Sequence, residues 1–399
     1  MKHLALVAAL LAPLPALANP DPADWDSVLA EAQGQTVYWN AWGGSTTTND
    51  FIAWVGMRVA EDYGVTLEHV KLTDTADAVT RVLSEKQAGV DDGGAIDMIW
   101  INGANFSAMK DADLLFGPFA EQLPNWSVVD TEGKTVQTDF TVPVEGYEAP
   151  WAMAQVVFIH DTADLAEPLG SMQAILEWSD ANPGRFTYPQ PPDFLGATFL
   201  KQALVDLIDD QTPFYSAATD ENYAAVTAPL WGYLDALTPT LWRQGRAYPA
   251  TGPAQLQMIA DGEVDLAISF SPGEATAAIA NQQLPDTVRT FVLDKGTIGN
   301  ASFVAIPYNS GSAAGAMIVA NFLMSPEAQA RAQDPEVLGY GTVLDMTALN
   351  AQDRALFDAL DLGVATLSPA DLGSVVAEPH PSWMTRITDD WISRYGSAQ

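Results

Sequence analysis

The chain has 399 residues, a net charge of −34 and no cysteine. So acidic a surface repels phosphate backbones and anionic lipids, which argues against nucleic acids and membrane surfaces as partners. The absence of cysteine excludes disulfides and a lipid anchor on cysteine, and a chain of this length can fold as two domains on its core alone.

The first 18 residues have the pattern of an export signal. Lys2 and His3 precede an apolar run over 4–17, and Ala16-Leu17-Ala18 has the small residues of a cleavage site. The run is interrupted by two prolines and is too short to span a membrane comfortably. We therefore expect cleavage after Ala18 and a monomeric, periplasmic protein without a lipid anchor.

The N-terminal part alternates short apolar strands with amphipathic helices. The periodicity predicts strands at 36–39, 65–72 and 96–101, and helices at 50–63 and 76–87. The last of these strands is almost continuously apolar, as in a sheet that is covered on both faces. The order βαβαβ therefore predicts a parallel sheet with right-handed crossovers.

The rest of the chain predicts a second sheet and further helices. Residues 143–151 are rich in turn formers, and the last 50 residues have a mostly helical pattern. The remaining predicted strands are 154–159, 185–188, 264–270, 290–293 and 302–306, and the predicted helices are 171–179, 197–208, 255–260 and 313–323.

Two α/β units joined by more than one segment predict a bilobed protein with a hinge and an interlobe cleft. The expected ranges are a signal peptide at 1–18, the first lobe at 19–155, the second lobe at 156–285, a return to the first lobe at 286–345 and a C-terminal helical segment at 346–399. In open α/β sheets the ligand lies outside the carboxyl ends of the strands. The loops after the strands are therefore the candidate binding loops.

In the first unit, two such loops carry polar and aromatic residues. Glycines allow close approach of a ligand, and hydroxyl and amide groups can orient it. Both loops also open a helix, so ordinary helix capping explains the same residues. The candidate residues are Trp42, Gly43, Gly44, Ser45, Thr46, Asn102, Asn105 and Phe106.

The second wall of the cleft is expected from the crossover segments and the second unit. Glu274 is the carboxylate best placed for a cation, although glutamate is also common in the first turn of a helix. Aromatic residues here either stack on a ligand or belong to the core. The candidates are Trp151, Tyr188, Phe194, Phe270, Ser271, Glu274 and Asn300.

The combination of aromatic rings and acidic residues favours a cationic organic ligand, because ammonium groups bind to aromatic faces. Solubility alone also explains the net charge. A small anion at the helix start after Ser45 is the second possibility.

Motifs of the common catalytic sites are absent from the sequence. It has no zinc-protease motif, nucleophile elbow or phosphate-binding loop, and its four histidines are scattered. We therefore expect no metal, no cofactor and no enzymatic activity. The alternative is an exported hydrolase that acts on carbohydrate through a pair of carboxylates, because such pairs are available in so acidic a chain.

Several segments resemble a known family, the YnjB-like substrate-binding proteins of bacterial ABC transporters, related to thiamine-, polyamine- and iron-binding periplasmic proteins. The resemblance covers the chain after the signal and is carried by VYWNAWGGSTTTNDFI (37–52), IDMIWINGANFSAMK (96–110), APWAMAQVVFIHD (149–161), GRFTYPQPPDFLGATF (184–199), GEVDLAISFSPGEA (262–275), FVAIPYNS (303–310) and FLMSPEAQ (322–329). It implies two α/β lobes that close on a small molecule and deliver it to an inner-membrane permease. It does not name the ligand.

Overall fold

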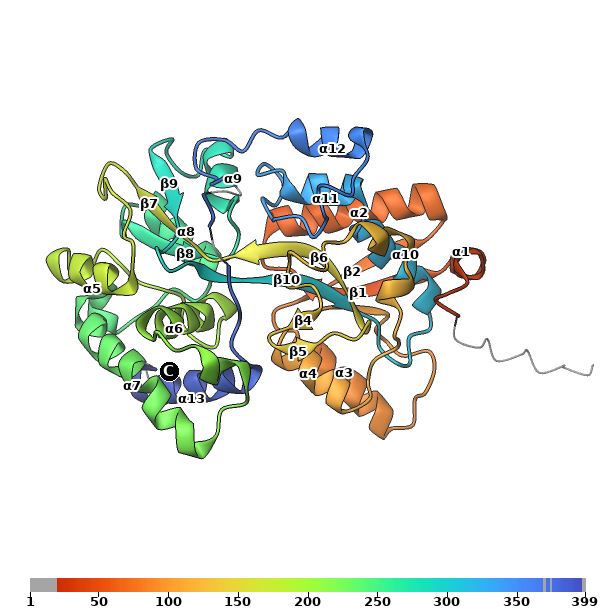
Figure 1. Cartoon of the computed structure of the whole chain (residues 1–399), viewed down its shortest axis with the longest axis horizontal. Helices are drawn as coiled ribbons and strands as arrows, with labels where there is room; N and C mark the ends of the chain where they lie inside the picture. The colour runs from red at the N-terminus through yellow and green to blue at the C-terminus, as the bar shows by residue number, and fades with distance from the viewer. Residues whose placement is uncertain (1–19, 369–370, 374, 397–399) are drawn as a thin grey trace, which may run out of the picture.

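The computed structural model describes residues 20–368, 371–373 and 375–396, so the expected signal peptide lies outside the described residues. These residues form two lobes, each with its own sheet and helices (Figure 1). The bilobed α/β architecture expected from the sequence is confirmed.

The sheet of the first lobe begins with three parallel strands. Strand β1 pairs in parallel with both β2 and β3, and α2 and α3 connect them, which confirms the βαβαβ prediction. Helix α2 begins before the predicted residue 50, because the Ser45 hydroxyl accepts the N–H of Thr48 and caps it. The bounds are α1 Trp25–Ala32, β1 Thr36–Trp42, α2 Thr46–Tyr63, β2 Thr66–Leu72, α3 Ala76–Gln87, β3 Met98–Ile101 and α4 Ala104–Asp111.

Two long antiparallel strands, β6 (Glu148–Gln155) and β10 (Thr297–Ala305), lead from this sheet to the second lobe (Figure 1). Strand β10 also pairs antiparallel with β3 and parallel with β11 (Val375–Val376). The prediction of turns up to residue 151 is therefore wrong over 148–151, where the chain is extended and paired with β10. A small hairpin, β4 (Thr138–Asp139) and β5 (Val142–Pro143), precedes β6.

The second lobe holds a three-stranded antiparallel sheet in the order β8-β7-β9. The predicted strand at 185–188 is wrong, because Phe186 makes only an isolated bridge to Leu266. The bounds are β7 Val157–Asp161, α5 Met172–Ala181, α6 Phe194–Leu207, α7 Asp220–Leu237, α8 Gly252–Ala260, β8 Leu266–Ser269, α9 Glu274–Ala280 and β9 Val288–Phe291.

The C-terminal part differs from its mostly helical prediction. Helices α10 (Ala313–Leu323), α11 (Pro326–Gln333) and α12 (Ala351–Asp358) belong to the first lobe, and α13 (Pro381–Tyr395) lies on the second (Figure 1). The described residues between α12 and α13 form no helix. In α13, Trp383 and Trp391 are fully buried in the core of the second lobe, which returns the chain end there.

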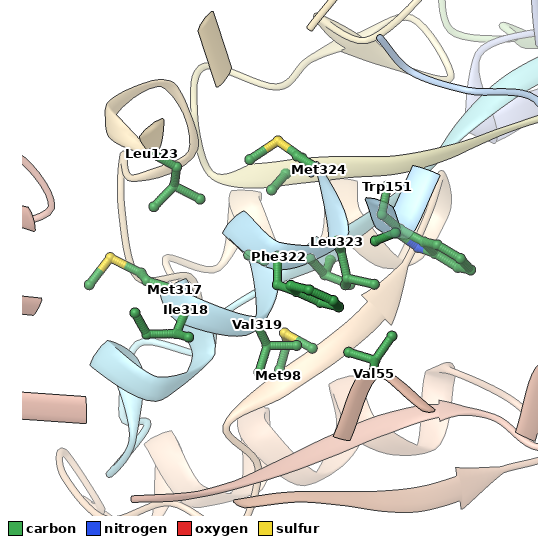
Figure 2. Packing of buried hydrophobic residues seen from close by; sticks show 14 of the residues in the cluster. Val55, Met98, Leu123, Trp151, Met317, Ile318, Val319, Phe322, Leu323 and Met324 are labelled. Carbon is green, nitrogen blue, oxygen red and sulfur yellow. The ribbon is translucent and has the colours of Figure 1, made fainter. Parts of the chain in front are cut away.

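The core of the first lobe is built around α10, which has the predicted bounds 313–323 and is buried over its whole length. Figure 2 shows its side chains packed against the sheet and α2. Trp151 is 0% exposed and stacks on Phe51 with ring centroids 5.9 Å apart. The second lobe has a comparable aromatic core, in which the Tyr188 and Phe199 rings stack at 4.1 Å. Each lobe therefore has its own core.

Candidate ligand-binding site between the lobes

The loop after β1 is shaped mainly by its own packing. A Cβ at Gly44 would lie 2.4 Å from the Trp42 ring, and one at Gly43 would lie 2.6 Å from Lys71 Cβ, so both positions require glycine. The Ser45 hydroxyl caps α2, and Thr46 is exposed in the first turn of that helix. These contacts account for the loop without a ligand, which leaves its binding role a prediction.

The loop after β3 holds a buried carboxyl group in place. Asn102 Nδ2 donates to the carbonyl of Ala301 at 2.7 Å and to Asp139 Oδ1 at 3.3 Å. The Gly103 N–H donates to Asp139 Oδ2 at 2.5 Å. Asn102 thus connects the start of α4 with the β4–β5 hairpin and the crossover strand β10. Asn105 is partly buried in the first turn of α4.

The hairpin that carries Asp139 has a strained turn. Its two central residues, Phe140 and Thr141, have φ of 44° and 72°, values that favour glycine and are unusual for a β-branched side chain. A Cβ at Gly103 would lie 2.8 Å from the Phe140 ring, so the ring packs directly on the backbone of α4. Strain of this kind persists only where the surroundings enforce it, and it is concentrated at functional sites.

The Phe140 ring meets a lysine from the other lobe. Lys201 lies in α6, and its Nζ is 4.6 Å from the centroid of Phe140 and 5.5 Å from that of Phe194. The same Nζ forms an ion pair with Glu378 Oε2 at 2.5 Å, and each of the two side chains is only 2% exposed. Asn300 Nδ2 donates to the other oxygen of Glu378 at 3.1 Å. We name Phe140, Phe194 and Glu378 the ammonium cage of Lys201.

A second group of polar residues lies at the end of β8. The hydroxyl of Ser269 donates to the Glu274 carboxylate at the start of α9, and Ser271 Oγ donates to the carbonyl of Leu338 at 2.9 Å. Beside them, the Phe270 ring meets the edge of Phe194, with centroids 5.3 Å apart. Phe194 is 51% exposed, and its ring contacts both Lys201 and Phe270.

The lobes touch directly beside Glu274. The Gly273 N–H donates to the Gly339 carbonyl at 3.1 Å, and a Cβ on Gly273 would lie 2.3 Å from the Gly339 Cα. Burial raises the pKa of the nearby Tyr340 hydroxyl to about 12, and the negative charge of Glu274 adds to this rise. Both glycines are therefore required for the close approach of the two backbones.

Three acids at this junction are buried, and burial disfavours their charged form. Burial raises the pKa of Asp139 to about 8, against the opposing bonds from Gly103 and Asn102. Burial likewise raises the pKa of Glu274 and of Glu378. We call Asp139, Glu274 and Glu378 the junction acids. Burial also raises the pKa of Glu148 well above its usual range, and neither of its carboxyl oxygens has a hydrogen-bond partner among the described residues.

Three of the predicted aromatic residues lie in the cores instead of facing this junction. Phe106, Trp151 and Tyr188 are each 0% exposed. Phe106, on α4, belongs to a buried cluster with residues of α3 and β3, Trp151 packs on Phe51, and Tyr188 packs on Phe199. Their rings therefore have no face exposed to a ligand in this structure. The prediction used the position of a residue at the end of a strand, and this position does not reveal which other elements cover the residue.

The structure does bring several predicted residues together. Phe194, Phe270, Ser271 and Glu274 form one side of the junction, and Asn102 and Asn300 hold two of its acids. Sequence analysis missed Asp139, Phe140, Lys201 and Glu378. The only available signal was Lys201, a lone charge inside the apolar run 197–205.

Two broader findings concern the described residues. Within them, no group of three or more His, Cys, Asp or Glu residues is arranged to hold a metal ion. Across the same ranges, no helix is both long enough and apolar enough to cross a membrane.

Comparisons with known proteins agree with this architecture. A family model described as bacterial extracellular solute-binding protein matches residues 56–354. The chain is 42% identical over 374 residues to Protein YnjB of Escherichia coli strain K12, covering 94% of each protein. The resemblance seen in the sequence is thereby confirmed.

Solved structures show the same fold at low sequence identity. The spermidine/putrescine ABC transporter substrate-binding protein PotD of Streptococcus pneumoniae matches with a TM-score of 0.61 and 15% identity, covering 90% of this chain and 98% of that one. The apo ferric ion-binding protein A of Pasteurella haemolytica matches with a TM-score of 0.62 and 12% identity, covering 91% and 98%. The periplasmic binding protein AfuA of Actinobacillus pleuropneumoniae, with fructose-6-phosphate bound, matches with a TM-score of 0.62 and 12% identity, covering 91% and 99%. With two lobes that meet at a polar junction and a family model that covers most of its length, the chain belongs to the bacterial extracellular solute-binding proteins.

Proposed function

We propose that this protein captures a cationic organic solute, such as a thiamine- or polyamine-like molecule, between its lobes and delivers it to an inner-membrane ABC permease. In this proposal it is exported with a cleaved signal, has no lipid anchor, and works as a monomer without enzymatic activity. The candidate contacts are Phe194, Phe270, Ser269, Ser271 and Glu274.

The charge balance at the junction carries the proposal. Of the junction acids, Glu378 is paired with the buried ammonium of Lys201, which also lies near Asp139, whereas Glu274 accepts a hydrogen bond from the hydroxyl of Ser269. Within the described residues, no lysine or arginine forms an ion pair with Glu274. A buried carboxyl group with a raised pKa gains most from a cation that is brought to it, since the cation stabilises its charged form.

The aromatic residues near Glu274 support the same ligand class. Phe194 and Phe270 meet edge to face, and Phe194 keeps about half of its surface exposed. An ammonium or a cationic ring over such a face gains about 0.5–2 kcal/mol, depending on how far it is desolvated. A phosphate would gain less at this position, because the Glu274 carboxylate repels its negative charge.

The burial of the acids favours binding over hydrolysis. A glycosidase needs two carboxyl groups that flank the scissile bond and leave room for substrate or water. Glu148 is 0% exposed, and both oxygens of the buried Asp139 already accept hydrogen bonds. These two carboxyl groups are therefore not presented to a substrate.

Binding in this proposal requires no chemistry, only closure of the lobes. The ligand contacts one lobe, and the second lobe closes over it by bending of the connecting segments. The ligand shifts the population toward the closed form only as far as it binds that form more tightly. The contact between Gly273 and Gly339 limits how closely the lobes can approach.

The test is a thermal-shift panel on protein purified without denaturation, preceded by native mass spectrometry for any co-purified ligand. The panel contains amines, thiamine, phosphates and sugars. We expect cations to raise the melting temperature in proportion to the logarithm of their concentration. A response confined to phosphates or sugars would refute the proposed ligand class.

A matched pair of variants tests the site itself. Glu274→Gln should lower the affinity for the stabilising cation about tenfold or more, because a charge-assisted contact is worth roughly 1.5–3 kcal/mol. Glu336→Gln, a change at an exposed residue, should leave the affinity unchanged. Equal affinities for the two variants would mean that Glu274 does not contact the ligand.

A further inference from the structure

Two strands connect the lobes, and both are buried where they cross from one lobe to the other. Strand β6 ends at Gln155, and the chain enters the sheet of the second lobe at Val157. Strand β10 runs beside it, with Gly299 paired to Gln155, and all of its residues are buried. The N–H of Val156 also donates to the carbonyl of Ile298 at 2.8 Å. Movement of one lobe against the other therefore bends the chain near these residues.

A third segment packs tightly against the two crossing strands. Strand β11 pairs in parallel with the start of β10. A Cβ at Gly299 would lie 2.9 Å from the carbonyl oxygen of Ala154 in β6 and 2.9 Å from Cγ1 of Val375 in β11. The three segments therefore approach one another so closely that only glycine fits between them at this position.

The side chain of Gln155 joins all three segments by hydrogen bonds. Its Nε2 donates to Thr297 Oγ1 of β10 at 3.1 Å and to the carbonyl of Leu372, ahead of β11, at 3.0 Å. Gln155 is 6% exposed and Thr297 is 0% exposed, so water does not readily replace these bonds when they break. One amide at the end of β6 thus holds the other two segments in place.

Helix α6 of the second lobe is bonded to the same part of β10. The N–H of Ile298 donates to Gln202 Oε1 at 2.8 Å. The neighbouring Lys201 pairs with Glu378, which accepts a hydrogen bond from Asn300 of β10. Gln202 is 0% exposed, and its Nε2 has no partner among the described residues. Strand β10 is therefore fixed by buried side chains from both lobes at the point where it crosses.

We propose that Gln155 is a positioning residue of the hinge, whose amide holds the lobes at the spacing seen in this structure. Here the lobes are in contact, with the N–H of Gly273 donating to the carbonyl of Gly339. Bending at the crossing strands lengthens or breaks the bonds that Gln155 donates, which leaves the Thr297 hydroxyl and the Leu372 carbonyl without this donor. The amide therefore favours lobes in contact over separated lobes, whichever ligand the protein binds.

The experiment measures the distance between the lobes in the mature protein, freed of ligand by dialysis. Because the chain has no cysteine, Gln87→Cys in α3 and Ala225→Cys in α7 supply one exposed labelling site on each lobe. Double electron–electron resonance of the spin-labelled protein gives the distance distribution. In this background, Gln155→Met keeps the length of the side chain and removes the amide. We expect the fraction of molecules outside the main distance peak to rise at least about fivefold.

Two further variants show whether the effect belongs to the hinge. Thr297→Val removes one of the two acceptors with little change in shape, and should raise the same fraction about twofold. Gln257→Met removes an exposed amide that donates to Asp261 within the second lobe, and should leave the distribution unchanged. Equal distributions for Gln155→Met and the unsubstituted background, or an equal change in Gln257→Met, would overturn the proposal.

Circular dichroism and the melting temperature of each variant are measured in parallel. If Gln155 served only the stability of the fold, Gln155→Met would lower the melting temperature and leave the distances in the folded protein unchanged, which refutes the proposal. If Gln155→Met does not fold, Thr297→Val decides, and an unchanged distribution in that variant refutes it as well. Failure of the proposed function looks different, because the thermal-shift panel would then show no response to cations, whereas these distances require no ligand.

Discussion

Buried acids in the core of the first lobe and at the junction between the lobes differ in their hydrogen-bond partners. In the core, Asp97 accepts hydrogen bonds from the N–H groups of Tyr38 and Ser312 and from the hydroxyl of Ser310. At the junction, Asp139 has a pKa of about 8 because of burial, and the carboxyl group of Glu148 has no hydrogen-bond partner within the described part of the chain.

Glu85 shows the same contrast from the side of the core. Burial alone would raise its pKa, but bonds from Arg81, Asn309 and the Ala95 N–H outweigh the burial and lower it. Asp97 and Glu85 thus each accept three hydrogen bonds, whereas the bonds that Asp139 accepts do not outweigh its burial, and Glu274 accepts one from the hydroxyl of Ser269. Burial of an acid alone therefore does not indicate a binding site. The hydrogen-bond and ion-pair partners of the acid have to be considered as well.

The largest expected effect breaks the core. Trp151→Ala removes a fully buried side chain that packs on Phe51, Trp39 and Trp100, and should cost about 3–5 kcal/mol of unfolding free energy. Denaturant titration measures this cost. A loss below about 1 kcal/mol, together with weaker ligand binding, would return Trp151 to the list of ligand contacts.

The next largest effect is expected for Asp97, the buried acid in the core of the first lobe. Asp97→Ala leaves the N–H groups of Tyr38 and Ser312 without their acceptor and should cost about 2–4 kcal/mol. The thermal shift caused by the cation should persist in this variant. A variant as stable as wild type would remove the contrast between core and junction.

The pH dependence tests the junction. The folded-state pKa of Asp139 is raised to about 8 from its usual 3.8, so the folded protein holds a proton that the unfolded chain loses. The contribution of Asp139 to the unfolding free energy is therefore fully present below about pH 4. It decreases as the pH rises to about 8, by up to about 1.4 kcal/mol for each pH unit. In Asp139→Asn, the melting temperature should depend less on pH between about 4 and 8 than in the wild type. An equal pH dependence in both proteins would show that the pKa of Asp139 is not raised in the folded state.

The smallest effect concerns an aromatic residue at the junction. Phe194→Ala should change the unfolding free energy by less than about 1 kcal/mol, because the ring is half exposed. It should weaken cation binding about three- to tenfold through the lost aromatic face. Titration of the variant checks this, and unchanged affinity would place the ligand elsewhere.

Much of the fold follows from local patterns. Helices α3 and α10 have the predicted bounds, and β1, β2 and β3 pair in parallel as their alternation with helices required. These elements could be predicted because apolar periodicity and capping residues act over a few residues of sequence. Strand β6 was missed over 148–151, since its pairing depends on β10, which lies far away in sequence.

The site was predicted only in part, for the same reason. Strand-end position selected Phe194, Phe270 and Glu274, which the structure places at the junction, and it also selected Trp151 and Tyr188, which other elements cover completely. Burial of a side chain depends on what packs over it, and no local pattern contains that information.

The sequence by itself determined the βαβαβ order that opens the first lobe, the acidic net charge and the two-lobed class, because these depend on composition and short-range periodicity. Only the tertiary structure determined which acids are buried and which of them forms an ion pair with a buried lysine. Lys201 and Glu378 are 177 residues apart in the chain, yet they form a buried ion pair. Their shared environment is created by the folding of distant segments onto one another, and the charge balance of the junction arises there.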